Sequence, residues 1–438
     1  MGLFIVTPTA RIQTVIELID EVLATERPAD GVLSAYFRAR RFIGAKDRRE
    51  ISNQIWRILR YRARLTWALG TEAPTGRLLV AANLICGESK SIDSISGLFS
   101  GAKNGPLPLS VNEKRMVLRA KNQNTDVAPR SVKFECPEWI LKKIDVDFGD
   151  EADKEISAFV DEAGLDLRVN TLKATRDEVL KSLNSEGLDA LPTSLSPIGI
   201  TLPDRIAIGA HAGFQGGLFE VQDQASQICA QLVEAQPGQA VIDICAGAGG
   251  KTLAIAGSMV NKGRLVACDI SVGRLKRNKK RLRRAGVHNA TLRIIEEHDK
   301  WLKRQAGVFD RVLVDAPCSG TGAWRRNPDA RWHFSPESLE NIIATQDGLM
   351  DRAAALVKPS ARLIYATCSI LAEENTARAE AFLARNSNFR AHPVNKIWPR
   401  IFSSPYPQIV TPDSPFLTLT PARHGTDGFF VAIFDRVS

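Results

Sequence analysis

Apolar residues recur every three or four positions in the first part of this 438-residue chain. One such run extends from Ile12 to Leu23 after Thr9, which is a suitable helix cap, and another extends from Ile51 to Leu69. This spacing predicts amphipathic α-helices, because it places the apolar side chains on one helix face. The first 130 residues are therefore expected to be all-α. Shorter helices are expected over 77–86 and 112–121, with a polar linker over 121–133.

The pattern changes after Pro137. Apolar and polar residues alternate from Leu165 to Asn170, which predicts a β-strand. The segment Thr175–Leu183 has helical spacing, and Gly187 is placed to end that helix. Residues 137–217 are therefore expected to form a small α/β unit.

Short apolar runs bounded by Pro, Gly or Ser dominate the rest of the chain. Such runs predict buried parallel strands, and helical segments between them, such as 253–259, predict the crossover helices of a doubly wound α/β sheet. In such a sheet, ligands bind beyond the carboxyl ends of the strands. The runs are Ala240–Ile244, Arg264–Cys268, Arg311–Asp315 and Arg362–Thr367.

Two cysteines follow strand-like runs. Cys318 comes after the run that ends at Asp315, and Cys368 comes after the run that ends at Thr367. Because the carboxyl ends of parallel strands share one edge of a sheet, both thiols are expected to face one crevice. A stabilised thiolate is a strong nucleophile at neutral pH, so this placement indicates covalent chemistry.

A turn rich in small residues follows the first strand-like run. It reads Cys245-Ala246-Gly247-Ala248-Gly249-Gly250-Lys251-Thr252 and leads into a helix. Such a turn lets a ligand approach backbone N–H groups at a helix start. Asp269 follows about 20 residues later, where an acid in a nucleotide-binding βαβ unit usually takes the ribose hydroxyls. The turn departs from the full Gly-x-Gly-x-x-Gly pattern, because position 252 is Thr.

The same turn suggests an alternative, a phosphate-binding P-loop. Gly250-Lys251-Thr252 ends like a P-loop, and Asp315 stands where such enzymes place a magnesium ligand. A P-loop needs a glycine where this chain has Cys245, and the Pro317-Cys318 pair has no role in holding Mg²⁺. These two positions disfavour a P-loop nucleotidase.

The three motifs together resemble those of the Sun/Nop-type RNA (cytosine-5)-methyltransferases, with the bacterial ribosomal RNA methyltransferase B group as the nearest likeness. They are Asp315–Gly322, Thr367-Cys368-Ser369 and Cys245–Thr252. The family turn usually has Ala-Pro where this chain has Gly247-Ala248, and its Pro-Gly-Gly strand-entry turn is 359–361 here. Supporting matches are Gln222–Ser226, Arg325–Asp329, Glu373-Glu374-Asn375 and Asp427–Phe430.

The resemblance implies a catalytic set. Cys368 would add to carbon 6 of cytosine as the nucleophile, which makes carbon 5 reactive toward a methyl donor. Cys318 would assist release of that bond. Asp315 would hold a nitrogen of the cytosine, and Lys251 would orient Asp315 or stabilise the thiolate.

The resemblance also implies S-adenosyl-L-methionine as cofactor. Its methionine and adenosine portions would lie over Cys245, Ala246, Gly247, Ala248, Gly249, Gly250 and Lys251. Asp269 would take the ribose, Asp299 would lie near the adenine, and Asp315 would touch the methionine end. Arg274 is a candidate to pair with an anion of cofactor or substrate. Either Asp269 or Asp299 could instead be only a helix cap, and Cys245, Cys268 and Cys229 could be core thiols.

Family likeness suggests three domains. Residues 1–130 resemble the RNA-binding domain of the antitermination factor NusB. Residues 137–217 correspond to an RNA-recognition-like subdomain, although this segment has no aromatic stacking motif. Residues 218–438 would form the S-adenosylmethionine-dependent catalytic domain.

Composition fits an intracellular enzyme that binds RNA. The net charge is +9, with ten Lys or Arg between Arg38 and Arg64 and twelve between Arg274 and Arg304. Such runs favour a phosphate track. Seven cysteines without Cys-x-x-Cys spacing argue against a disulfide framework or a metal site. No apolar stretch approaches membrane-spanning length and the first residues have no signal-peptide start, so we expect a cytoplasmic monomer.

The sequence therefore predicts methylation of a cytosine in RNA, with small-subunit ribosomal RNA as the expected partner and no membrane. Two alternatives from other classes are a P-loop nucleotidase in ribosome assembly and a catalytically silent RNA-binding assembly factor. S-adenosylmethionine binding separates the first from the enzyme, and methyl transfer separates the second.

Overall fold

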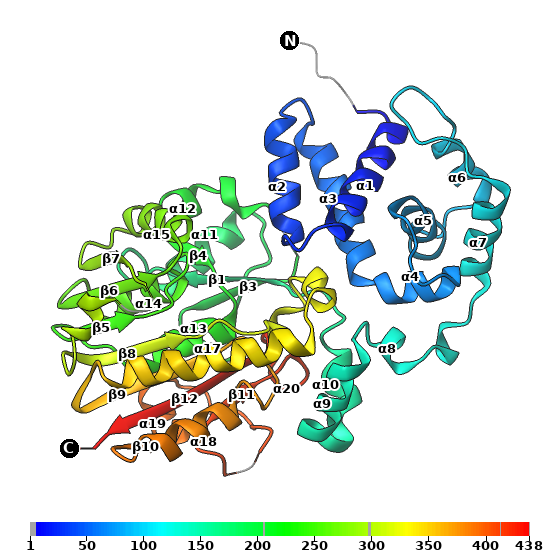
Figure 1. The fold of residues 1–438 in the computed structure, drawn as a ribbon. Coiled ribbons are helices and arrows are strands. Elements are labelled where there is room, and N and C mark those ends of the chain that lie inside the picture. The colour runs from blue at the N-terminus through cyan, green and yellow to red at the C-terminus, as the bar shows by residue number, and fades with distance from the viewer. Residues whose placement is uncertain (1–5, 205, 297–298, 412, 438) are drawn as a thin grey trace. The chain divides into compact units, whose positions relative to one another are not determined.

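The structure is a computed structural model that describes residues 6–204, 206–296, 299–411 and 413–437 (Figure 1). Its contacts divide the chain into two compact units. The first comprises Met1–Val146 with Arg326–Phe334, and the second comprises Asp147–Arg325 with Ser335–Ser438. The first unit thus continues past the predicted boundary at 130 and includes a segment from the predicted catalytic region. The division into three domains stays a prediction.

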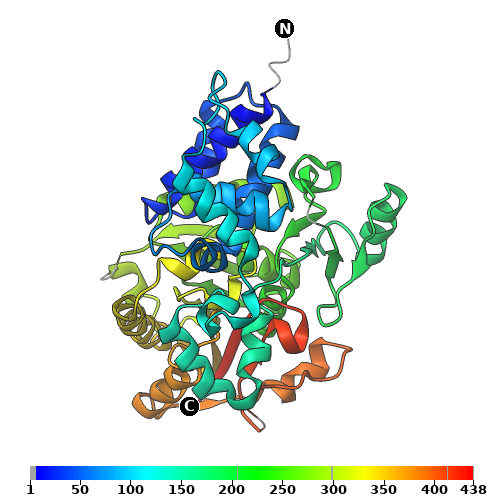
Figure 2. The same ribbon diagram turned by 90° about the vertical axis from the view of Figure 1, so that its right-hand side faces the viewer.

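The first unit is helical, and its apolar side chains form one core (Figure 2). Residues predicted to line the helix faces are in that core, including Ile12, Ile19, Ile51 and Ile55. Its helices are α1 (Pro8–Leu23), α2 (Ala29–Ala39), α3 (Ala45–Arg60), α4 (Arg62–Leu69), α5 (Gly76–Ala82), α6 (Ile92–Leu98), α7 (Val111–Asn122) and α8 (Arg130–Lys133), with η1 (Asn83–Gly87) and η2 (Thr125–Val127). Helix α9 (Glu138–Phe148) follows.

Three predictions for this unit need correction. The cap of α1 is Thr7 and not Thr9, because Pro8 occupies the first helical turn and the Thr7 hydroxyl accepts the Ala10 N–H. The predicted helix over 51–69 belongs to two helices that meet at Tyr61. The polar segment 121–133 is also more ordered than a linker, since it contains η2 and α8.

The carboxylate of Glu135 explains the break at Tyr61. It accepts the backbone N–H groups of Ala63 and Arg64 at 2.7 and 2.9 Å, so it caps α4 from outside the helix. Arg331, from the segment 326–334, donates to the Glu135 carbonyl at 3.2 Å. The cap residue lies about 70 positions away in the sequence, so local helix signals do not reveal it.

The second unit begins with a small antiparallel sheet of order β2-β3-β1-β4. All five residues of β1 are buried, and Gln227 donates to the Leu167 carbonyl within it. The sheet thus has no open central strand on which RNA bases could stack. Its elements are α10 (Ala152–Ser157), β1 (Leu165–Val169), α11 (Arg176–Ser185), β2 (Leu191–Pro192), β3 (Gly199–Leu202), α12 (Ala212–Gln215) and β4 (Phe219–Val221), with η3 (Gly149–Glu151) and η4 (Ile208–Ala210).

The predicted helix stop is also found here. Thr175 and Glu178 form a capping box at the start of α11, and Gly187 adopts φ +78° just after its end.

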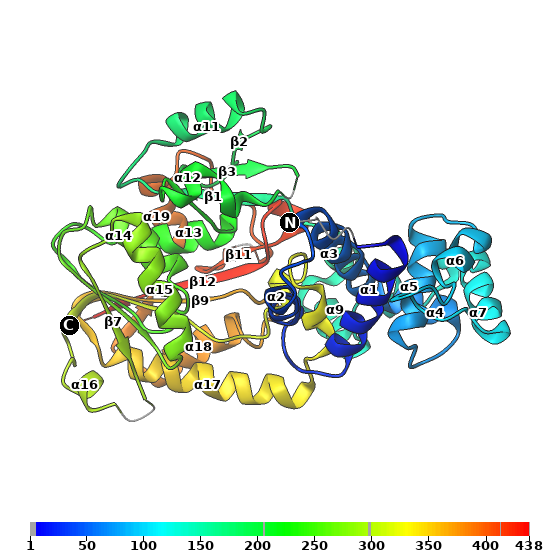
Figure 3. The same ribbon diagram turned by 90° about the horizontal axis from the view of Figure 1, so that it is seen from above.

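The rest of the second unit is a large sheet covered by helices on both faces (Figures 1 and 3). In the described residues its order is β10-β12-β9-β8-β5-β6-β7, with β11 paired to β12. Strands β5 to β9 are parallel, and β10 to β12 pair antiparallel. Helices α13, α14 and α19 pack on one face, and α17 and α18 pack on the other.

The bounds of these elements place each predicted strand in the sheet. Strands are β5 (Ala240–Asp243), β6 (Arg264–Asp269), β7 (Ala290–Ile294), β8 (Phe309–Asp315), β9 (Val357–Thr367), β10 (Phe389–Ala391), β11 (Leu417–Leu419) and β12 (Phe429–Arg436). Helices are α13 (Gln224–Leu232), α14 (Gly250–Ser258), α15 (Val272–Ala285), α16 (Lys300–Lys303), α17 (Pro336–Ala354), α18 (Thr376–Arg385), α19 (Val394–Ile401) and α20 (Pro421–His424), with η5 (Thr321–Ala323) and η6 (Pro328–Trp332).

Strand pairing brings the motifs together. Strands β8 and β9 are parallel neighbours with Asp315 opposite Ala366, so Cys318 and Cys368 leave the sheet side by side. Strands β5 and β6 are neighbours in the same sense, so the turn after β5 lies beside the end of β6. The expected strand-entry turn at 359–361 lies inside β9 instead, where Ser360 adopts φ +60°.

Candidate active site

A cavity of about 1220 Å³ lies at the carboxyl ends of the parallel strands in the second unit. Every predicted catalytic residue lines it, and so does every predicted cofactor residue except Gly249. The predicted residues in its wall are Cys245, Ala246, Gly247, Ala248, Gly250, Lys251, Asp269, Arg274, Asp299, Asp315, Cys318 and Cys368.

Gly249 has a structural role beside the cavity. It adopts φ +87°, and a Cβ there would lie 2.2 Å from Oδ1 of Asn278, a residue of α15. Only glycine therefore allows α15 to pack this closely against the turn. Gly247 also has a positive φ, of +55°, but its Cβ position is open.

Asp269 is the last residue of β6, and its carboxylate binds the turn that follows β5. Its Oδ2 accepts the Gly247 N–H at 2.9 Å, and its Oδ1 accepts the Ser271 N–H at 2.7 Å. The residue is 4% exposed. Asp269 thus fixes the turn that follows β5 and lines the cavity as well.

Asp299 caps a helix, which was one of its two predicted roles. Its Oδ1 accepts the N–H groups of Trp301 and Leu302 at 2.7 and 3.1 Å, at the start of α16. It also lines the cavity, so a contact with a bound molecule stays a prediction.

Lys251 and Asp315 form a close ion pair within the cavity. Lys251 Nζ lies 2.7 Å from Asp315 Oδ2 and 4.8 Å from the centre of the Phe429 ring. Burial disfavours the ammonium form, but the Asp315 carboxylate, together with the nearby Cys229 and Cys368 sulfurs, outweighs this effect and raises the pKa of Lys251. The lysine is 8% exposed, so its charge is directed at Asp315.

The neighbouring hydroxyl is also engaged. Thr252 Oγ1 donates to Asp243 Oδ2 at 2.7 Å. In a P-loop, the corresponding lysine and hydroxyl would reach phosphate and Mg²⁺. Here Thr252 is bound to the buried Asp243 and Lys251 to the half-buried Asp315, which argues against the nucleotidase alternative.

The two cysteines predicted to be catalytic are in contact. Cys318 Sγ and Cys368 Sγ are 3.4 Å apart. The hydrogen bond with Cys368, burial and the nearby Glu374 carboxylate raise the pKa of the Cys318 thiol well above its ordinary value. These effects disfavour the thiolate form of Cys318.

The remaining cysteines differ in position. Cys229 and Cys268 are core residues, and burial raises the pKa of each to about 12. Cys245 packs against the core cluster that contains Cys268, and it also lines the cavity. All seven are free thiols.

The apolar residues that line one side of the cavity were not predicted from the sequence. Ile270 and Ile295 follow β6 and β7 directly, so their place after a strand was an available signal. The other members come from α16 and α17 or just beyond, where no motif marks them: Leu302, Leu349 and Leu356. An apolar wall, a carboxylate at Asp269 and an open glycine turn fit an adenosine-like group.

The described part of the chain also bears on metal binding and on membrane insertion. No group of three or more His, Cys, Asp or Glu side chains in those residues could hold a metal ion. Of the helices described, none combines the length and hydropathy that crossing a membrane requires.

Comparison with protein families gives two matches. Residues 230–435 match the family described as 16S rRNA methyltransferase RsmB/F. Residues 136–209 match the ferredoxin-like domain of RsmF/B-like methyltransferases. The second match covers strands β1 to β3 of the small sheet.

Curated relatives show the same likeness. A ribosomal RNA small subunit methyltransferase B of Enterobacter sp. is 32% identical over 312 residues, which are 70% of this chain and 68% of that protein. The protein of that name from Photorhabdus laumondii is 33% identical over 297 residues, 68% of this chain and 65% of its own length. The matched region thus spans about two thirds of each relative.

Solved structures share the fold. The crystal structure of PH0851 superposes with a TM-score of 0.80 at 24% identity, covering 99% of this chain and 100% of that one. A methyltransferase homologue from Pyrococcus horikoshii superposes at 0.60, with 24% identity and coverage of 72% and 100%. These likenesses confirm the predicted α/β fold.

Proposed function

Because this chain belongs to the RsmB/F family of 16S rRNA methyltransferases, we propose that it methylates carbon 5 of a cytosine in small-subunit ribosomal RNA. S-adenosyl-L-methionine is the methyl donor and supplies an electrophilic methyl group. The proposed reaction proceeds through a covalent bond between the enzyme and the base. RNA cytosines must leave their stack to enter such a cavity.

Cys368 serves as the nucleophile in this proposal. Its sulfur adds to carbon 6, and the electron pair of the 5,6 double bond becomes available at carbon 5. Carbon 5 takes the methyl group, and a base then removes its proton. The electron pair of that C–H bond re-forms the 5,6 double bond and expels the Cys368 sulfur from carbon 6. Cys318, whose sulfur lies 3.4 Å from that of Cys368, gives a proton to the departing Cys368 sulfur.

Asp315 and Lys251 act on the base. An Asp315 oxygen is placed to hold the cytosine nitrogen that must be protonated as the sulfur adds. Lys251 binds the other side of that carboxylate at 2.7 Å and fixes its orientation. The Lys251–Asp315 ion pair needs little rearrangement during the reaction, because both side chains are already held in the cavity.

The cofactor would be held by the turn after β5 and by Asp269. The turn presents small residues and backbone groups, and Asp269 is the carboxylate placed for the ribose. The apolar wall with Ile270 and Ile295 would take the adenine. These roles are proposals that the cavity lining supports.

The observation that carries the proposal is the 3.4 Å contact between Cys318 and Cys368 beside Asp315 in one cavity. The test is to incubate the purified chain with 16S rRNA and S-adenosylmethionine carrying a labelled methyl group, then map the RNA by bisulfite sequencing. The proposal predicts label in RNA and a new bisulfite-resistant cytosine. Label on another base or on a cytosine nitrogen would contradict it.

The same preparation separates the two alternatives. A nucleotidase would gain thermal stability from ATP, whereas this enzyme should gain it from S-adenosylmethionine. A silent assembly factor would bind the RNA and transfer no methyl group.

A further inference from the structure

One buried carboxylate connects the two cysteine loops. Glu374 is 0% exposed and lies after β9. Its Oε1 accepts the Ser319 N–H at 2.8 Å and the Gln346 side-chain N–H at 3.1 Å. Its Oε2 accepts the hydroxyls of Ser319 and Ser369, each at 2.5 Å.

The donors are neighbours of the reactive sulfurs. Ser319 directly follows Cys318, and Ser369 directly follows Cys368. Gln346 also donates to the carbonyl of Pro317, on the other side of Cys318, at 3.0 Å. Moving Glu374 would therefore release both loops that set the distance between the sulfurs.

The charge of Glu374 has a second effect. A buried carboxylate is costly, and four donors compensate for that cost. A neutral side chain that accepts hydrogen bonds could also connect the two loops. Holding the loops in place therefore does not by itself explain why this residue is acidic. A negative charge close to the sulfurs opposes ionisation, and it adds to the larger effects of the Cys368 hydrogen bond and of burial in raising the pKa of Cys318.

We propose that Glu374 is a positioning residue that fixes the separation of the two sulfurs and keeps Cys318 in its thiol form while Cys368 attacks. This inference rests on the proposed function, but part of its test does not. Cysteine reactivity can be measured without RNA or cofactor.

The experiment compares Glu374→Gln with the native chain and with Glu380→Gln, an exposed control on α18 that makes the same charge change. The alkylation rate of each cysteine by iodoacetamide is followed by peptide mass spectrometry from pH 6 to 10. We expect the Cys318 profile in Glu374→Gln to move about one pH unit lower, a tenfold gain in thiolate at a given pH. We expect the control to match the native chain.

Turnover supplies the second readout. In Glu374→Gln, kcat for methyl transfer should fall about tenfold or more, while KM for RNA stays within about twofold, because no substrate contact is removed. Glu374→Asp, which keeps the charge, should retain the native Cys318 profile. An unchanged profile together with unchanged kcat in Glu374→Gln would overturn the proposal.

A further variant guards against misfolding. If Glu374→Gln does not fold, Ser319→Ala removes the hydroxyl that bonds to Glu374, Ser369 and Thr321, and it leaves the carboxylate and its bond to the Ser319 backbone N–H in place. It should lower kcat without moving the Cys318 profile, and native kcat would overturn the positioning role. If the native chain transfers no methyl group at all, the proposed function fails, while the alkylation profiles still decide the effect of Glu374 on Cys318.

Discussion

Arg281 Nη2 lies 3.0 Å from Oε2 of Glu220, a side chain that is only 3% exposed. Arg284 reaches the other oxygen of the same carboxylate, and Arg281 Nη1 donates to the Ala248 carbonyl at 3.0 Å. These contacts join α15 to β4 and to the turn that lines the cavity. Two cations of the basic run on α15 thus have a structural role and are not free to bind phosphate.

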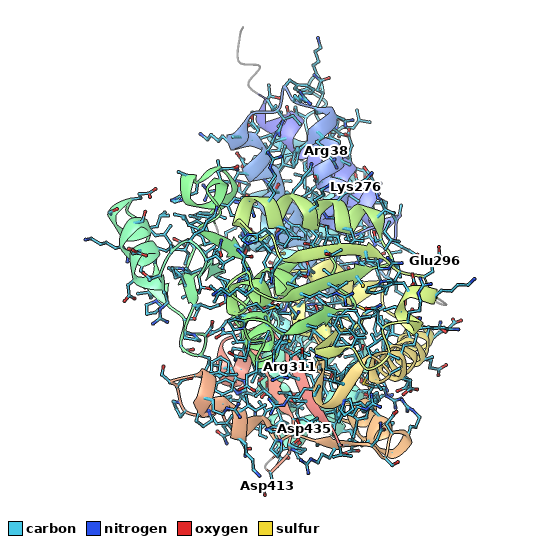
Figure 4. The ribbon with its side chains drawn as sticks, turned by 90° about the vertical axis from the view of Figure 1, so that its left-hand side faces the viewer. Arg38, Lys276, Glu296, Arg311, Asp413 and Asp435 are labelled. Carbon is cyan, nitrogen blue, oxygen red and sulfur yellow. The ribbon has the colours of Figure 1, made fainter. Side chains whose placement is uncertain are left out.

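The exposed cations of α15 are the better candidates for RNA contact. They include Lys276, which Figure 4 labels, with Arg277, Lys279 and Lys280. Replacing these four with Gln should weaken RNA binding and reduce the slope of log K against log salt by up to about 3, because fewer counterions are released. Fluorescence anisotropy from low to high salt measures the slope.

The paired arginines provide the matched control. Arg281→Gln should leave the salt slope within error and should lower the melting temperature, because Glu220 then keeps a buried charge with fewer partners. An unaltered slope in the fourfold variant would show that this face is only solvated.

Local patterns predicted the sheet and the site well, for a physical reason. Buried parallel strands are short and apolar, and their order in a doubly wound sheet brings the residues after them to one edge. Cys318, Cys368 and Asp315 were therefore placed in one cavity from the sequence alone, and the structure brings them together.

What the sequence did not predict depends on distant partners. Glu135 caps α4 from about 70 residues away, and Glu220 recruits Arg281 across 61 positions. Neither contact leaves a periodic signal. The role of Asp299 was ambiguous for a related reason, since a carboxylate in its position can cap a helix or contact a ligand, and the structure shows the cap.

Asp269 gives a test of the cofactor site. Asp269→Ala should weaken S-adenosylmethionine binding about 10- to 100-fold, because hydrogen bonds to charged groups are each worth about 1.5–3 kcal/mol. RNA affinity should change by less than about twofold. Calorimetry with the cofactor alone and anisotropy with RNA alone make the comparison, and native cofactor affinity would refute the assignment.

The protonation of Asp243 can be tested through the pH dependence of folding stability. Burial raises the pKa of Asp243 to about 7, against the lowering effect of the Thr252 hydroxyl. Between about pH 4, the ordinary value, and pH 7, the folded chain holds a proton that the unfolded chain has lost. Stability from this group is therefore fully present below pH 4 and falls as pH rises toward 7.

The isosteric variant Asp243→Asn removes this titration. Its stability relative to the native chain should rise by up to about 1.4 kcal/mol per pH unit between pH 5 and 7, then level off above pH 8. Denaturant unfolding of both proteins at each pH measures the difference. A difference that is constant with pH would mean that Asp243 is ionised in the folded chain.

The most direct test of the covalent mechanism replaces each reactive cysteine in turn, with labelled RNA and S-adenosylmethionine present. Cys318→Ala should still attack and methylate but fail to release, and it should run on a denaturing gel as a protein–RNA adduct. Cys368→Ala should form no adduct and no 5-methylcytosine, since in this mechanism only the Cys368 sulfur adds to carbon 6. An adduct in Cys368→Ala would reverse the two roles, and full activity in Cys368→Ala would contradict covalent catalysis by this cysteine.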